Sequence, residues 1–240
     1  KPWKNSQNSW VSRRPTVSLS HFRGVERRPG EDAGNVTVDR FEHGWYWLIP
    51  LRDDIMSVGA VCSPEYLKQR RSDNETFLMQ TLNARGSVAR RMRGAERVAP
   101  VHATGNYSYG CTRMSGPGWV MAGDAYAFID PVFSSGVFLA MLSAEQASEA
   151  VDGALREPAR ERALQKAMEK RFRRGLKHFS WFIHRFTSPV MKRLFSAPRN
   201  DFQLQQAVVS MLAGDVFDNP AVIRRLYIFR ALYALNAIAI

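Results

Sequence analysis

This sequence has no dinucleotide-binding glycine loop, few cysteines and no long apolar run, and each shortage excludes a class of protein. No Gly-x-Gly-x-x-Gly occurs among its 240 residues, so the loop that grips a dinucleotide pyrophosphate is absent. Cys62 and Cys111 are the only cysteines. They form no CxxC or Cys–His spacing, which argues against a disulfide framework and suits a reducing cytoplasm. No apolar run reaches the roughly 18–20 residues of a transmembrane segment, and the start lacks a signal-peptide layout.

Acidic residues are also in deficit. The 34 Lys and Arg residues outnumber 22 Asp and Glu, for a formal net charge of +12. Such an excess suggests an acidic partner, of which nucleic acid is the generic example. No zinc spacing, RNA-binding signature or recognition-helix pattern accompanies the charge, so we predict no nucleic-acid partner. The five histidines are scattered without the spacing of metal ligands, so no metal site is predicted.

Turn residues divide the N-terminal half into short strands. Strand-like runs over 16–25, 35–41, 45–51 and 56–62 are separated by turns such as His43-Gly44. Short connections imply hairpins and hence a largely antiparallel sheet. Ser63-Pro64-Glu65 has the N-cap, proline and acidic residue of a helix start. The pattern predicts helices over 64–71, 74–83 and 87–93, and then strands over 97–104 and 107–114.

The C-terminal half is predicted to be almost entirely helical. Helical segments are expected over 134–155, 157–185, 189–195, 201–213 and 220–237. Ser188-Pro189 and Asn219-Pro220 are the expected breaks, because proline opens a helix more easily than it continues one.

Residues 118–140 carry the most informative motif. Trp119–Ala122 is predicted to be a buried strand, followed by a sharp turn at Gly123-Asp124, a second turn at Asp130-Pro131 and a long apolar helix that opens near Ser134. The glycine allows a ligand close to the backbone, and the aspartate can accept hydrogen bonds from hydroxyls. The Ser-Ser-Gly helix start aims free amides at negative charge. These features suit an anionic, hydroxyl-rich ligand; an ordinary strand–turn–helix connection is the alternative.

Trp45-Tyr-Trp-Leu-Ile-Pro50 is a second compact motif. On a strand, positions 45, 47 and 49 share one face. Two indoles and an isoleucine would therefore form a rigid apolar wall, and Pro50 ends regular pairing because it has no amide hydrogen. A core strand is the alternative, because aromatic stripes usually belong to the core.

Together these motifs resemble the flavin-dependent halogenase family, the tryptophan-halogenase-like branch of the FAD-dependent monooxygenase superfamily. Residues 45–50 match its Trp-x-Trp-x-Ile-Pro pattern. Residues 118–136 look like its second flavin-contacting segment, with the halogenase form Asp130-Pro-Val-Phe-Ser-Ser-Gly136. Phrases at 21–27, 57–61, 104–109 and 179–186 also look like these relatives, so the resemblance extends from about Ser20 to Asp215.

The resemblance implies an oxidoreductase that uses FAD, reduced by a flavin reductase, with chloride or bromide. The implied cofactor contacts are Gly123, Asp124, Pro131, Ser134, Ser135 and Gly136, and the amides of Ser135 and Gly136 would hold the halide. Trp45 and Trp47 would form an active-site wall that keeps the substrate from the oxidant and diverts the oxidant to halide. Phe133 stands where tryptophan halogenases have a catalytic glutamate. The implied substrate is therefore an electron-rich aromatic of the phenol or pyrrole type, either free or tethered to an acyl or peptidyl carrier protein.

The fold implied is α+β, a fragment of an α/β FAD-dependent monooxygenase-like fold. It would have an irregular lead-in (1–15), an antiparallel-sheet substrate domain (16–115), a returning flavin-contacting strand–turn–helix (116–155) and a helical region (156–240). We expect the glycine loop and a catalytic lysine to belong to a missing N-terminal part, so that this chain alone would be inactive. If the substrate is tethered to an acidic carrier protein, the basic cluster from Lys170 to Arg193 is where we expect it to dock; an ordinary solvated surface is the favoured alternative.

Two alternatives to halogenation remain open at this point. A flavin-dependent monooxygenase or reductase of the same fold would hydroxylate or reduce its substrate instead. A protein of another class, a non-catalytic basic binding module, would bind an acidic partner through its charge.

Overall fold

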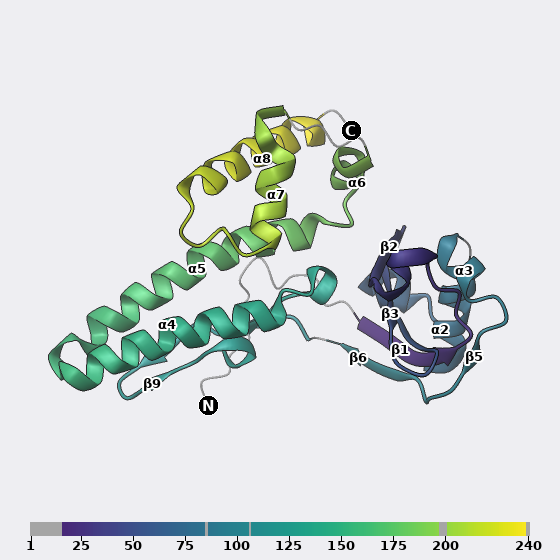
Figure 1. Cartoon of the computed structure of the whole chain (residues 1–240), viewed down its shortest axis with the longest axis horizontal. Helices are drawn as coiled ribbons and strands as arrows, with labels where there is room; N and C mark the ends of the chain where they lie inside the picture. The colour runs from purple at the N-terminus through teal and green to yellow at the C-terminus, as the bar shows by residue number, and fades with distance from the viewer. Residues whose placement is uncertain (1–15, 85, 106, 197–200, 239–240) are drawn as a thin grey trace. The chain divides into compact units, whose positions relative to one another are not determined.

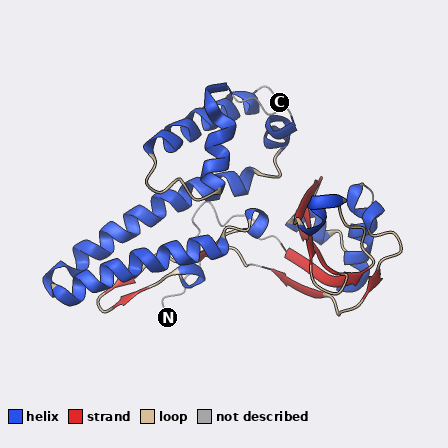
Figure 2. Cartoon of the chain, in the orientation of Figure 1, coloured by secondary structure: helices blue, strands red, loops and turns tan. Residues whose placement is uncertain are grey.

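The computed structural model describes residues 16–84, 86–105, 107–196 and 201–238. The chain forms two compact units, and the boundary between them lies between Tyr107 and Ser108. Each unit has its own secondary structure, strands with short helices in the first and mainly long helices in the second (Figures 1 and 2).

The first unit contains the predicted antiparallel sheet. Its strands are β1 (Thr16–Arg23), β2 (Thr37–Phe41), β3 (Gly44–Pro50) and β4 (Ile55–Cys62), with the shorter β5 (Glu96–Arg97) and β6 (His102–Gly105). They are ordered β2-β3-β4-β1-β5, and β6 also pairs with β1. Every pair is antiparallel, which confirms the sequence prediction.

Short turns fix the register of this sheet. Glu42 and His43 alone connect β2 to β3, so that Phe41 pairs with Gly44. The turn between β3 and β4 places Asp53 at φ 57° and Asp54 at φ 55°, a left-handed conformation that aspartate tolerates better than most residues. The resulting register sets Trp47 opposite Gly59.

Three short helices cover one face of the sheet: α1 (Pro64–Lys68), α2 (Asn74–Asn83) and α3 (Ser87–Arg91). Ser63 Oγ caps α1 by accepting from the amide of Tyr66 at 3.3 Å, as the sequence predicts. The core beneath the helices includes Phe22, Leu48 and Leu78, all fully buried. Because side chains alternate along a strand, Trp45 and Trp47 lie on the opposite face.

The second unit begins with two small two-stranded sheets and one-turn helices. Strand β7 (Tyr109–Gly110) pairs with β10 (Ala127–Phe128), and β8 (Ser115–Gly116) pairs with β9 (Trp119–Val120). The 3-10 turns η2 (Gly123–Ala125) and η3 (Pro131–Phe133) then lead into α4 (Gly136–Arg156).

Helices make up the rest of this unit. After the short turn η4 (Pro158–Arg160), α5 (Glu161–Arg185) runs beside α4 (Figure 1). Then come α6 (Pro189–Ser196), η5 (Asp201–Gln203), α7 (Leu204–Leu212) and α8 (Pro220–Ile238). The predicted breaks at Ser188-Pro189 and Asn219-Pro220 are confirmed. An aromatic core joins α4, α5 and the loop before α8, through Phe138, Phe172, Phe179 and Phe217.

Three strand predictions were wrong. The strand predicted over 97–104 is broken at Pro100, which has no amide to donate, and the strand over 107–114 is replaced by short pieces with different partners. The buried strand Trp119–Ala122 is limited to Trp119–Val120, and the Trp119 side chain is 39% exposed. The long helix predicted to open near Ser134 is confirmed; it begins at Gly136, because Ser134 has a φ of 52° that a right-handed helix cannot contain.

No helix among the described residues is both long and apolar enough to span a bilayer.

Candidate functional site

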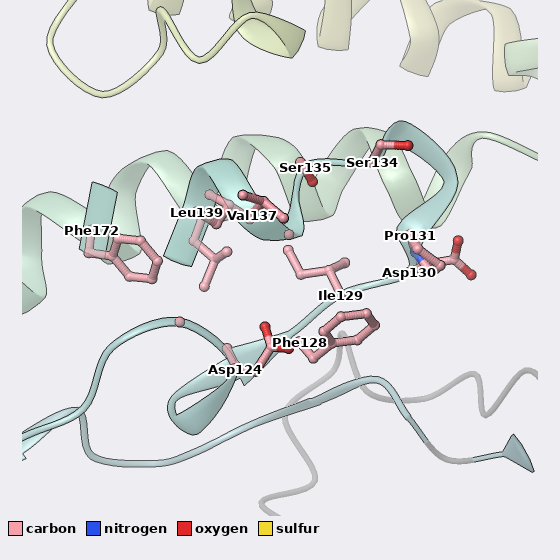
Figure 3. Close-up of a pocket in the computed structure, with 14 residues that line it drawn as sticks. Asp124, Phe128, Ile129, Asp130, Pro131, Ser134, Ser135, Val137, Leu139 and Phe172 are labelled. Carbon is pink, nitrogen blue, oxygen red and sulfur yellow. The ribbon is translucent and has the colours of Figure 1, made fainter. Parts of the chain in front are cut away.

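A cavity of about 260 Å³ in the second unit brings together all six predicted cofactor contacts. Its walls come from η2, β10, η3 and the first turn of α4, with Phe172 and Leu176 added from α5. Asp124 and Phe128 lie on one side of the cavity, and Val137 and Leu139 of α4 lie on the other (Figure 3). The predicted residues are Gly123, Asp124, Pro131, Ser134, Ser135 and Gly136.

Gly123 holds the turn against α4. A Cβ at this position would lie 2.9 Å from Cβ of Ala140, and the residue has a φ of +53°, so only glycine fits without strain. The buried amide of Gly123 donates to Ser143 Oγ at 2.7 Å. Ser143 in turn donates to the carbonyl of Ala140 at 2.9 Å. This buried pair of hydrogen bonds fixes the Gly123-Asp124 turn beside the first turns of α4.

Asp124 is exposed at the cavity, while its backbone is tied to the neighbouring hairpin. The hydroxyl of Tyr109 donates to the Asp124 carbonyl. Burial, and then the nearby Asp124 carboxylate, raises the pKa of Tyr109. The phenol therefore stays protonated and keeps donating at neutral pH.

The start of α4 leaves amide groups available. The Asp130 carboxylate accepts from the amide of Val132 at 3.1 Å, and Ser134 donates its amide to the carbonyl of Pro131 at 2.8 Å. Ser135 is the N-cap residue, but its side chain makes no capping hydrogen bond. The first backbone bond of the helix is from Leu139 to Ser135, at 2.9 Å. The amides of residues 136–138 therefore have no acceptor within the helix, and the helix dipole adds partial positive charge there.

Gly136 leaves this helix start open on the cavity side. A Cβ at Gly136 would meet only Phe128, at 3.9 Å. Phe133, just before the start, makes an edge contact with Phe186 at a centroid distance of 5.1 Å. The cavity thus combines amide donors with apolar walls, a chemistry suited to a planar or anionic ligand that also has an apolar part.

Trp45 and Trp47 belong to the first unit. Their ring centroids are 5.8 Å apart with a tilt of 48°, so they share one face of β3 as predicted. Trp45 is buried, whereas Trp47 is half-buried and donates Nε1 to Ser57 Oγ at 3.2 Å. The Trp47 ring occupies the space above Gly59, where a Cβ would lie 2.2 Å from ring atom Cζ2. The two indoles therefore lie side by side on this face of β3.

Sequence reasoning missed three residues that shape the cavity. Ser143 is fully buried, and Phe172 and Leu176 reach the cavity from α5. Ser143 carries a detectable signal, because it is the only hydroxyl in the apolar run 137–144 and lies two helical turns after Gly136. The two α5 residues carry no such signal, because they meet the cavity only through the packing of α4 on α5.

Comparison with known proteins identifies the family. The sequence model of the family described as tryptophan halogenase matches residues 33–192. A 1H-pyrrole-2-carbonyl-[peptidyl-carrier protein] brominase from Pseudoalteromonas luteoviolacea is 31% identical over 141 residues, which cover 58% of this chain and 35% of the relative. A 1H-pyrrole-2-carbonyl-[peptidyl-carrier protein] chlorinase from Pseudomonas fluorescens is 30% identical over 173 residues, which cover 72% of this chain and 38% of the relative.

Solved structures agree with the sequence matches. The flavin-dependent brominase Bmp2 superposes with a TM-score of 0.77 at 25% identity, covering 91% of this chain and 56% of that structure. The myxobacterial chondrochloren halogenase CndH gives a TM-score of 0.67 at 27% identity, and the match covers 92% of this chain and 55% of that structure. The chain thus spans little more than a third of the two curated relatives and about half of the solved structures. It belongs to the tryptophan halogenase family of flavin-dependent halogenases.

Proposed function

We propose that this chain is the part of an FAD-dependent halogenase that contacts the isoalloxazine edge of the cofactor and the halide. The observation that carries the proposal is the cavity at the start of α4, where the six predicted contacts surround one space. The substrate would be an electron-rich aromatic of the phenol or pyrrole type. We use "full-length enzyme" for a polypeptide that joins this chain to the dinucleotide-binding part implied by the resemblance.

The residues of the cavity fit a flavin. Gly123 lets the turn come close to α4, and the exposed Asp124 carboxylate can accept from ligand hydroxyls. Apolar walls such as Phe128 and Leu139 suit a planar ring. Reduced FAD, with oxygen, supplies the two-electron oxidant that turns chloride or bromide into an electrophile. In this proposal the positive end of α4 stabilises negative charge on the bound ring.

The same helix start is the proposed halide position. The amides of Ser135 and Gly136 would donate to chloride or bromide, which suits backbone amides because they carry partial positive charge and no competing acid. Gly136 has no Cβ and the space beside it is open, so a chloride or bromide ion could approach its amide. Ser135 and Gly136 would thus hold the halide next to the oxidant.

Phe133 and the relatives support the choice of substrate. Phe133 packs against Phe186 and has no acid that could orient a hypohalous species, unlike the glutamate of tryptophan halogenases. The relatives at 30–31% identity act on pyrrole-2-carbonyl groups held by a peptidyl carrier protein. We therefore propose a phenol or pyrrole ring, including one tethered to a carrier. Trp45 and Trp47 would be the wall that keeps this ring from reacting directly with the oxidant.

The test is product analysis with the full-length enzyme, a flavin reductase, FAD and pyrrole-2-carbonyl carrier protein, with and without bromide. Mass spectrometry should show bromine incorporation only when bromide is present. Hydroxylated product in both samples would favour a monooxygenase and refute the proposal.

Asp124→Ala tests the cofactor contacts within the same enzyme. We expect FAD affinity to fall by about 1–3 kcal/mol, because a ligand hydroxyl loses its acceptor. Asp152→Ala is the matched control, because Asp152 is an exposed carboxylate outside the cavity whose partner among the described residues is Arg156, four residues away. An FAD dissociation constant that is the same in both variants would leave Asp124 as a turn residue.

A further inference from the structure

Helix α8 (Pro220–Ile238) has a row of apolar side chains that are partly exposed. Its inner side is packed: Leu226 is fully buried, and Phe229 and Tyr233 contact the ring of Trp181 on α5. Its outer side exposes Ile228 at 38%, Leu232 at 36% and Leu235 at 63%. Spacings of four and three residues place these three side chains in one row, which we name the α8 stripe. Exposed apolar side chains that lie together are a feature of interaction sites.

The surroundings of the α8 stripe are basic. Arg224 lies one turn before Ile228 on the same side of the helix, and Arg225 follows it. Helix α8 contains no acidic residue. From residue 171 to the end of the sequence there are eleven Lys and Arg but only three Asp. A partner with carboxylates around an apolar spot would match this face.

We propose that the α8 stripe, with Arg224 and Arg225, is the docking surface for the carrier protein that presents the aromatic substrate. This inference rests on the proposed function and adds the place of contact. It moves the expected docking site from the basic cluster of α5 and α6 alone to a surface where charge and exposed apolar area occur together. The apolar row would supply affinity, while the cations would steer an acidic carrier into register.

Charge separates this surface from the other exposed apolar row in the unit. Helix α4 also exposes large apolar side chains, Val137, Met141, Val151 and Leu155. That row, however, adjoins the exposed acids Glu145, Glu149 and Asp152, which would repel an acidic partner. A second copy of this chain is also a poor occupant of the α8 stripe, because each copy carries a net charge of +12.

Binding provides the direct test. The probe is the peptidyl carrier protein on which the Pseudoalteromonas luteoviolacea relative acts, loaded with pyrrole-2-carbonyl and titrated with the full-length enzyme. Leu235→Glu should weaken binding about tenfold or more, and Leu235→Lys should weaken it less, because only glutamate repels an acidic carrier. Val209→Glu is the control, because Val209 is 58% exposed on α7, against 63% for Leu235. Binding should also weaken with added salt.

Several results would overturn the inference. These are a wild-type enzyme that does not bind the carrier, equal losses in Leu235→Glu and Val209→Glu, or equal binding by Leu235→Glu and Leu235→Lys. The inference would also be overturned if Leu235→Glu kept its affinity for the carrier and instead lost self-association, measured by light scattering, or binding to phosphatidylserine vesicles. Thermal melting checks that each variant is folded; glutamate and lysine both favour helix, so neither should unfold α8.

A small substrate separates this inference from the proposed function. The N-acetylcysteamine thioester of pyrrole-2-carboxylate needs no docking surface. Leu235→Glu should therefore halogenate the thioester as well as the wild type does, yet lose activity on the carrier-bound group. If the wild type halogenates neither substrate, the proposed function fails. If it halogenates both and the variant behaves like the wild type on both, the docking inference alone fails.

Discussion

Gly59 offers a test of whether the Trp47 ring has a functional position or only a structural one. The two residues face each other across β3 and β4. A Cβ at Gly59 would lie 2.2 Å from Cζ2 and 2.5 Å from Cη2 of Trp47, far inside van der Waals contact. In Gly59→Ala the indole must move and give up its 3.2 Å hydrogen bond to Ser57. We expect a loss of about 1–3 kcal/mol in unfolding free energy, the usual cost of overpacking. For a chain of this size, that is about 2–4 °C in Tm per kcal/mol.

Gly175→Ala is the matched control for this prediction. A Cβ at Gly175 would lie 2.2 Å from Cε1 of Phe217, so the clash is similar, but it occurs on α5 in the other unit. Helix propensity returns about 1 kcal/mol to this variant, which leaves a smaller net loss. The assay measures Tm, bromide incorporation and peroxide release on the same samples of full-length enzyme. Only Gly59→Ala should lower the ratio of incorporated bromide to released peroxide.

A double variant separates packing from function. Trp47→Phe makes room for the new methyl group, so Gly59→Ala/Trp47→Phe should be more stable than the sum of the single changes, by about 0.5–3 kcal/mol. It should still show the altered product ratio, because the second indole of the wall is gone. A lowered Tm with an unchanged ratio in Gly59→Ala would refute the role of Trp47 as an active-site wall. Additive stability changes would refute the packing argument.

Three further predictions concern the second unit. Ser143→Ala removes the acceptor of the buried Gly123 amide, so it should lower the unfolding free energy by about 1–3 kcal/mol and weaken FAD binding. Denaturation and fluorescence titration measure the two effects. The control Ser148→Ala removes an exposed hydroxyl on the same helix and should change neither quantity. Burial, and then the neighbouring cations, lowers the pKa of His178 to about 4 from 6.5. The unfolded state therefore binds more protons below pH 6.5, and stability should fall by up to about 3 kcal/mol between pH 6.5 and 4; a pH–stability curve that His178→Gln does not flatten would contradict this. Ser135→Ala should leave Tm unchanged, because this N-cap side chain makes no capping bond, whereas an ordinary capping serine is worth about 1 kcal/mol.

Features that depend on neighbouring residues could be predicted from the sequence. The hairpin at Gly44 and the helix start at Ser63 follow from residues within one turn of each other, and both are confirmed. The cavity at the start of α4 belongs to the same class in part. Gly123 and Gly136 are only 13 residues apart, so two tight turns suffice to bring the predicted contacts around one space.

Features that depend on distant packing could not be predicted. An aromatic residue before a glycine turn favours a buried strand, yet Trp119 is 39% exposed. Its indole covers Gly116, where a Cβ would lie 2.6 Å from Nε1, and so it packs on its own hairpin and not in the core. The supports from α5, Phe172 and Leu176, are 36 and 40 residues after Gly136, and no local pattern connects them to it.

The start of α4 is where local preference and structure disagree most, and the disagreement concerns the proposed site. Two serines before an apolar helix predict a side-chain cap. Instead, Ser134 adopts a left-handed φ of 52° and the Ser135 hydroxyl makes no cap. A non-glycine residue in that region costs about 1–3 kcal/mol unless its surroundings hold it there. Here the Asp130 cap of the preceding turn and the Ser134–Pro131 hydrogen bond provide the hold. The outcome is a helix start that lines the cavity and has no side-chain cap. That arrangement gains little for folding, and it is the one expected if an anion completes the helix start.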